Sequence, residues 1–291
     1  MAEPAHVPVL YYEVMAALNI AANGTYIDGT LGGGGHAQGI LERSSPAGRL
    51  LGLDRDPRAL EIAQQRLQVF AGRLIVVNRS FAAIGVVARG DGFTQADGIL
   101  LDLGLSSLQL ADPARGFSFL NGGPLDMRFD PTHGLRADEI VNHWSEHELA
   151  DMIYRYGEEP RSRQIARAIV RNRPLHSTTE LAAVIARGTH RRGRIHPATR
   201  TFQALRIAVN DELAEIERAL PQSVDLLRRG GRLAVISFHS LEDRLVKNFL
   251  RAQHEAGLLS ILTKKPLTAT AEEASANPRS RSAKLRIAVR E

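Results

Sequence analysis

The stretch from Gly24 to Gly39, which reads GTYIDGTLGGGGHAQG, constrains the fold more than any other part of the chain. A short apolar run, Tyr26-Ile27, leads to Asp28, and the consecutive glycines 32–35 precede a segment compatible with a helix. This order predicts a buried strand, a tight turn and a helix start. Glycine lets backbone N–H groups approach a ligand, and a helix N-terminus favours an anionic group. The alternative is a flexible linker, which does not explain the flanking strand and helix.

Further strands and helices alternate with this first unit. Strands are expected at 49–54, 74–77 and 96–101, with helices at 36–43 and 59–70. This spacing predicts a mostly parallel sheet with right-handed crossovers and helices on both faces, a Rossmann-like α/β fold.

The alternation stops after the fourth strand. Residues 109–194 carry no strong strand signal, and polar helical patterns occur at 144–155 and 161–171. We therefore expect a mostly helical inserted domain at 110–195, between the two parts of the sheet domain at 1–109 and 196–291. After it we expect a long helix at 199–220, a strand at 232–237, a helix at 241–252, a loop at 263–282 and a final strand at 284–289.

Composition narrows the class of protein. The 291 residues are 44% hydrophobic, which is enough for a sizeable core. There are no cysteines, so disulfides and thiolate metal sites are excluded. No secretory signal or bilayer-length apolar run is visible, and a cytoplasmic protein without a membrane partner is expected. A net charge of +5 is weak support for a polyanionic partner.

Acidic residues lie at the ends of three predicted strands, at Asp28, Asp54 and Asp102. Parallel strands end at the same edge of a sheet, where ligands bind near the switch point, so these side chains should converge. Asp54 follows the glycine turn at the separation from which an acid reaches ribose hydroxyls, although a helix N-cap ahead of Pro57 is the alternative. Phe81, after the third strand, is suited to border a planar base, or belongs to the core.

Several linked motifs then identify a resemblance. In chain order they are GTYIDGTLGGGGHA, LGLDRDP, DGILLDLGLSSLQL, FSF with GPLDMRFD, HPATRTFQALRIAVNDEL, ISFHSLEDRLVK and RSRSAKLRIAVR. Together they resemble the ribosomal RNA small-subunit methyltransferase H family, also called MraW or RsmH. The resemblance covers nearly the whole chain and is far more specific than any single glycine pattern.

The resemblance implies a class I methyltransferase that uses S-adenosyl-L-methionine. Its implied reaction is methylation of N4 of a cytidine in the decoding region of 16S rRNA, with the small ribosomal subunit as the favoured substrate. It implies a Rossmann-like sheet interrupted by a helical domain after the fourth strand. The cofactor-binding residues carried over by matching motif are Asp28, Gly34, Gly35, His36, Asp54, Phe81, Asp102 and Gln109. For His36, a packing or capping role at the helix start is the alternative.

The chemistry requires a group that accepts a proton from the cytosine amine, because its lone pair is delocalised into the ring. Many amino-group methyltransferases carry an acid or amide, two prolines and an aromatic residue after the fourth strand. This chain has the sequence DLGLS at 102–106 instead. The candidate catalytic residues are therefore Asp102, Ser106 and His239, with a satisfied histidine after a strand as the alternative for His239.

Arginines cluster in and beside the inserted domain. Arg163 and Arg167 share one helical face, and Arg191, Arg192 and Arg194 follow in a glycine-containing segment. We expect them to neutralise RNA phosphates, against the alternative of a solvated or ion-paired face. His143 and His147 have a spacing that can bind metal on one helix, but no third ligand is evident and no metal is expected.

Two other classes of protein remain possible from the residues. A nicotinamide-dependent oxidoreductase would account for the glycine pattern and Asp54, but not for the arginine clusters. A non-catalytic RNA-binding protein would account for the arginines, but not for an intact set of cofactor residues. The sequence does not define the oligomeric state.

Overall fold

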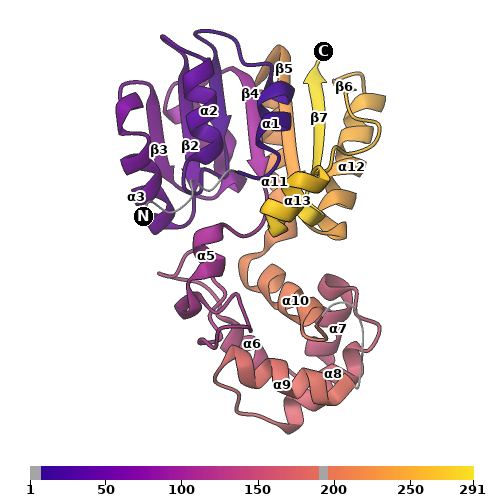
Figure 1. The fold of residues 1–291 in the computed structure, drawn as a ribbon. Helices are drawn as coiled ribbons and strands as arrows, with labels where there is room; N and C mark the ends of the chain where they lie inside the picture. Colours follow the sequence, from indigo (N-terminus) through magenta and orange to yellow (C-terminus); the bar gives the residue numbers. More distant parts are fainter. Residues whose placement is uncertain (1–7, 190–195) are drawn as a thin grey trace. The chain divides into compact units, whose positions relative to one another are not determined.

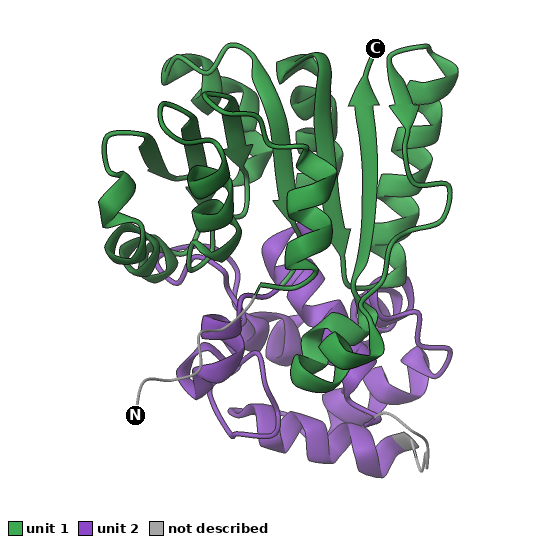
Figure 2. Ribbon diagram, turned by 45° about the horizontal axis from the view of Figure 1, so that its top comes forward, with its two compact units in different colours: residues 1–104, 213–291 green, residues 105–212 purple. Residues whose placement is uncertain are grey.

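The computed structural model describes residues 8–189 and 196–291 (Figure 1). The chain forms two compact units, of which unit 1 comprises residues 1–104 and 213–291 and unit 2 comprises residues 105–212 (Figure 2). Unit 2 begins earlier and ends later than the segment 110–195 that we expected as the insertion. Within the described ranges, no helix has the length and apolar character needed to cross a bilayer.

A seven-stranded sheet forms the centre of unit 1, with the order β3-β2-β1-β4-β5-β7-β6. Strands β1 to β5 pair in parallel, and β7 runs antiparallel to both of its neighbours. This confirms the predicted mostly parallel α/β fold. The strands are β1 (Thr25–Asp28), β2 (Arg49–Asp54), β3 (Leu74–Asn78), β4 (Ala96–Asp102), β5 (Leu227–Ser237), β6 (Leu259–Ile261) and β7 (Lys284–Arg290).

Helices cover both faces of the sheet, as predicted. Side chains alternate along each strand, so Tyr26 packs in one buried cluster and Ile27 in the other. The first cluster includes residues of α1 (Tyr11–Leu18), α2 (Gly35–Arg43) and α3 (Pro57–Arg66). The second includes residues of α4 (Ile84–Gly90), α11 (Glu212–Leu226) and α12 (Ser240–Glu255).

The chain order reverses between β1 and β4. From β1 the sheet continues through β2 and β3 on one side, and through β4 and β5 on the other. In open α/β sheets this switch point is where loops leave in opposite directions and a ligand site forms beyond the carboxyl ends of the strands.

The predicted loop at 263–282 is partly wrong, because it contains α13 (Ala271–Ala276) and the 3-10 turn η4 (Pro278–Ser282). Polar residues start both elements. Thr270 Oγ1 accepts a hydrogen bond from Glu273 N at 3.1 Å, and Asn277 Oδ1 accepts one from Arg279 N at 3.3 Å. Such Ser, Thr and Asn residues are N-caps as well as loop formers, which is why the composition misled the prediction.

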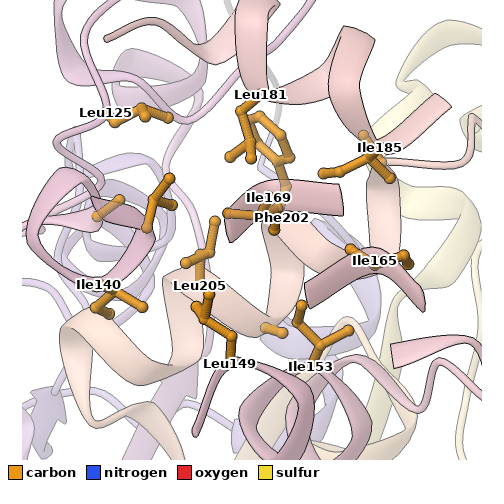
Figure 3. Packing of buried hydrophobic residues seen from close by; sticks show 14 of the residues in the cluster. Leu125, Ile140, Leu149, Ile153, Ile165, Ile169, Leu181, Ile185, Phe202 and Leu205 are labelled. Carbon is orange, nitrogen blue, oxygen red and sulfur yellow. The ribbon is translucent and has the colours of Figure 1, made fainter. Parts of the chain in front are cut away.

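The regular elements of unit 2 in its described part are helices, joined by a long irregular segment at 116–136 and by one isolated bridge between Pro124 and Ser177. Apolar side chains from several helices interlock in its core, among them Ile140, Leu149, Ile165 and Phe202 (Figure 3). Its elements are α5 (Ser107–Ala111), η3 (Pro113–Arg115), α6 (Ala137–His143), α7 (Glu146–Gly157), α8 (Ser162–Arg171), α9 (Thr178–Thr189) and α10 (Thr199–Asn210). The predicted helical insertion after the fourth strand is therefore confirmed.

The single long helix expected at 199–220 is wrong. Helix α10 ends at Asn210, and Asp211 adopts a left-handed conformation with φ 53° before α11 begins. Asn210 Nδ2 donates to Met127 O at 2.8 Å, and its Oδ1 accepts from Phe129 N at 2.7 Å. The left-handed backbone at Asp211 ends the helix, and the Asn210 side chain binds that end to the loop at 127–129. Similarly, His143 and His147 lie on two helices, α6 and α7, rather than one.

We predict that Ile99→Ala in β4 lowers the free energy of unfolding by about 2–5 kcal/mol, because it leaves a cavity in a close-packed core. Ile99 is fully buried and pairs between Ile27 and Leu233. Val69→Ala is the control, since Val69 is 84% exposed and its change should stay within about 0.5 kcal/mol. Urea denaturation measures both. Equal losses in the two variants would contradict the assignment of Ile99 to the core.

Candidate active site

Three acidic side chains end adjacent strands at the switch point. Asp28 in β1 lies opposite Gly52 of β2 and Leu100 of β4. Asp54 and Asp102 therefore extend from their strands just beyond the end of β1, one on each side. The register brings these acids to one edge of the sheet, as expected from the sequence.

Thr30 joins two of these strand ends. Asp28 Oδ1 accepts hydrogen bonds from Thr30 N at 3.1 Å and Thr30 Oγ1 at 3.4 Å. The same hydroxyl oxygen accepts a hydrogen bond from Asp102 N at 2.6 Å. Thr30 was missed by the sequence analysis, although a threonine two residues after an aspartate is a recognisable turn signal.

Asp54 shapes the glycine turn that follows β1. Its Oδ2 accepts from Gly32 N at 2.7 Å and its Oδ1 from Asp56 N at 2.9 Å. The N-cap of α3 is Asp56, whose side chain accepts from Arg58 N, so the capping alternative for Asp54 is wrong. Asp54 instead fixes the turn against the end of β2.

The glycines of the turn have two different roles. Gly32 and Gly34 have φ values of 51° and 79°, which only glycine adopts without strain. A Cβ on Gly35 would lie 2.5 Å from Pro8 Cγ, and one on Gly39 would lie 2.4 Å from the Tyr11 hydroxyl. These two glycines therefore make room for the N-terminal segment, which local sequence patterns do not reveal.

His36 is buried between this segment and Asp102. Its Nε2 lies 3.1 Å from Val9 O, and its Nδ1 lies 3.7 Å from Asp102 Oδ2. Burial lowers the pKa of His36 to about 4, and the contact with Val9 only partly opposes this. The neutral ring donates Nε2–H to the carbonyl, which leaves the Nδ1 lone pair facing the carboxylate.

Burial also dominates the electrostatics of the acids. It raises the pKa of Asp28 and of Asp102 to about 7, and that of Asp54 to about 6. The charge of Arg279 lowers the pKa of Asp102, whereas Asp28 raises it further. Asp102 Oδ1 is buried and has no hydrogen-bond partner among the described residues. The cluster therefore favours a cation or a hydrogen-bond donor.

The other predicted site residues lie at the starts of helices, where several of them cap the helix. Phe81 begins η2 (Phe81–Ala83) and is half-buried against the second core cluster. Ser106 and Gln109 form a reciprocal capping box at the start of α5, with bonds of 3.0 and 3.1 Å, and belong to unit 2. His239 is the N-cap of α12, where its Nδ1 accepts from Glu242 N at 3.4 Å.

The predicted RNA-binding arginines are described only in part. Arg163 and Arg167 lie on the exposed face of α8, opposite buried residues such as Ile165 and Ile169. Arg167 is 58% exposed, and its Nε lies 3.5 Å from Glu146 Oε1. The other predicted arginines, Arg191, Arg192 and Arg194, lie outside the described residues.

Comparisons with known proteins identify the family. Residues 3–291 match the model of the MraW methylase family. The chain belongs to this family. A Thermomicrobium roseum protein named Ribosomal RNA small subunit methyltransferase H is 52% identical, over 98% of this chain and 93% of that protein. A protein of the same name from Acidobacterium capsulatum is 50% identical, over 97% of each chain.

The MraW methylase fold also has distant structural relatives. A crystal structure from Clostridium thermocellum, provisionally named an rRNA-methylase, superposes with a TM-score of 0.51 at 10% identity. It covers 98% of this chain and 100% of its own. A likeness at this identity supports the fold alone.

The MraW methylase cofactor is S-adenosylmethionine. It carries a sulfonium and an ammonium group, together with a ribose diol that donates hydrogen bonds. The residues present fit it, because three desolvated carboxylates and the unpartnered Asp102 Oδ1 need positive charge or donors. The sequence analysis did not detect Arg279 beside Asp102, because they are far apart in the chain.

We predict that Gly34→Ala lowers the free energy of unfolding by about 1–2 kcal/mol, because an L-residue is strained at this φ. The added Cβ would also lie 3.0 Å from Leu67 Cδ1. Gly72→Ala is the control, since its Cβ would have no heavy atom within 4 Å. Thermal or urea unfolding measures both. A Gly34 variant as stable as the Gly72 variant would refute the strained turn.

We predict that the ligand-free protein loses stability as pH rises from about 4 to 7. The folded-state pKa of Asp28 is raised to about 7, so the folded chain binds more protons than the unfolded chain in this window. Asp28→Asn should therefore gain stability relative to wild type as pH rises, by at most about 1.4 kcal/mol per pH unit. Urea titrations at several pH values test this. A difference that is constant with pH would contradict the raised pKa.

Proposed function

We propose that this chain methylates N4 of a cytidine in the decoding region of 16S rRNA, cytidine 1402 in the usual rRNA numbering. The names of the relatives support an rRNA substrate in the small subunit. The observation that carries the proposal is the buried, unpartnered Asp102 Oδ1 at the end of β4, beside two further desolvated acids. These carboxylates would attract the positive charge of the cofactor and accept a hydrogen bond from the cytosine amine.

The adenosine end of the cofactor is proposed to bind at β2 and β3. Asp54 already accepts from two backbone amides, and a carboxylate has about four lone-pair sites, so it can still receive the ribose diol. Phe81 would border the adenine. The methionine end would lie toward Asp28, Gly34, Gly35 and His36, with Gln109 assigned from the resemblance alone.

The cofactor supplies a methyl group that is already activated by its sulfonium. The protein must then orient the cytosine amine and receive its proton. Asp102 is the proposed acceptor, because its buried Oδ1 lies at the end of β4 and has no hydrogen-bond partner among the described residues. Ser106 and His239 are weaker candidates, since each is engaged as a helix cap.

Unit 2 is the proposed RNA-recognition unit. Arg163 and Arg167 present cationic groups on one exposed helical face, and Arg191, Arg192 and Arg194 extend the set along the chain. Contacts with phosphates make binding fall steeply with salt. The proposed partner is the assembled small subunit in the cytoplasm, and direct transfer from a sulfonium requires no metal.

The test is to incubate the protein with small subunits and S-adenosylmethionine labelled in its methyl group. We expect label in 16S rRNA, recovered as N4-methylcytidine after digestion and mass spectrometry. Label at another atom would overturn the assignment of N4. Calorimetry with S-adenosylmethionine and with NAD separates a methyltransferase from an oxidoreductase, because only the first should bind.

We predict that Asp102→Asn lowers kcat by about 10²–10⁴-fold, since an amide keeps the shape but cannot take the proton. Asp225→Asn is a matched control on an exposed position of α11. Cofactor affinity, measured separately by calorimetry, distinguishes lost chemistry from lost binding. A kcat like that of wild type would place the proton acceptor elsewhere.

A further inference from the structure

A buried carboxylate outside the acid cluster joins three separate parts of unit 1. Glu215, on α11, is only 8% exposed. Its Oε2 lies 3.1 Å from Arg55 Nη1 and accepts a hydrogen bond from Ser80 Oγ, and its Oε1 lies 3.6 Å from Arg218 Nη2. Arg55 directly follows Asp54, and Ser80 directly precedes Phe81. Glu215 therefore fastens the turn after β2 to the turn after β3.

A second side chain on α11 holds the same region. Gln222 lies two helical turns after Glu215, so both side chains share one face of the helix. Gln222 Oε1 accepts from Gly85 N at 3.0 Å, and its Nε2 donates to Ala82 O at 2.8 Å. Helix α11 thus fixes both ends of η2, which carries Phe81.

The two turns are also joined directly. Asn78 Nδ2 donates to Asp54 O at 3.0 Å and to Arg55 O at 3.1 Å. The turn that carries Asp54 and the turn that carries Phe81 are therefore joined by Asn78 within the sheet and by Glu215 from the helix. A buried carboxylate is costly unless it is paired, so an apolar residue would hold the helix as well. The ion pair and the hydrogen bond to Ser80 also fix the orientation of the two turns, which an apolar contact would not do.

We propose that Glu215 is a positioning residue for the adenosine end of the cofactor, acting through Arg55 and Ser80. The inference rests on the proposed function, in which Asp54 receives the ribose and Phe81 borders the adenine. It predicts that losing the Glu215 charge weakens adenosine binding and leaves methyl transfer from bound cofactor nearly unchanged.

The experiment compares Glu215→Gln with Glu217→Gln, an exposed position on the same helix. Calorimetry measures the Kd of S-adenosylhomocysteine and of 5′-methylthioadenosine, which lacks the amino-acid end. We expect Glu215→Gln to raise both Kd values by about tenfold, because charge-assisted bonds in the binding region are lost. The single-turnover rate at saturating S-adenosylmethionine should stay within about threefold of wild type.

A second variant covers the case in which Glu215→Gln does not fold. The Arg55 side chain is 26% exposed, so Arg55→Gln removes the same ion pair near the surface, and Arg55→Lys should restore part of the affinity. Unchanged Kd values in the variants, or a fall in rate without a change in Kd, would overturn the positioning role. Failure of the wild-type protein to bind either ligand would instead refute the proposed function.

Discussion

The withdrawal of three carboxylates from bulk water at the switch point of the sheet, complete at Asp28 and partial at Asp54 and Asp102, is the constraint on which the site depends. Asp54, Asp28 and Asp102 end adjacent strands, and their burial disfavours ionisation in the ligand-free protein. Backbone amides and Thr30 satisfy part of the Asp28 and Asp54 side chains, whereas Asp102 Oδ1 has no hydrogen-bond partner among the described residues. We propose that a ligand carrying positive charge stabilises the ionised form of these carboxylates.

The rest of unit 1 maintains that arrangement. The parallel register places Asp54 and Asp102 just beyond Asp28, and the left-handed glycines let the chain turn back over the strand ends. The N-terminal segment packs against α2 and holds the neutral ring of His36, while α11 holds the turns after β2 and β3. We propose that Asp102, which lies near the neutral His36 ring and the charge of Arg279, receives the proton from the amine.

Local patterns in the sequence predicted the sheet well. Strands β1, β2 and β4 are short, largely apolar runs that end at an acid, and such a run can be recognised from neighbouring residues alone. The bounds of β2 were predicted without error, and the convergence of Asp28, Asp54 and Asp102 followed from parallel topology. Long-range contacts were beyond such patterns. Asn210, at the end of α10, binds a loop far along the chain, and Gly39 leaves room for the Tyr11 hydroxyl. The capping roles of Ser106 and His239 are local, and Gln109 three residues after Ser106 is a capping-box pattern that the prediction of a catalytic role overlooked.

We propose that these carboxylates form one site, and that a bound cation lowers the free-energy cost of ionising them. The most direct test of this claim is an NMR titration of carboxyl-labelled aspartates, assigned with single Asp→Asn variants, with and without saturating S-adenosylmethionine. The account predicts pKa values near 7 for Asp28 and Asp102 and near 6 for Asp54 in the free protein, with all three falling together on binding. Ordinary values in the free protein, or values that do not move when the cofactor binds, would contradict it.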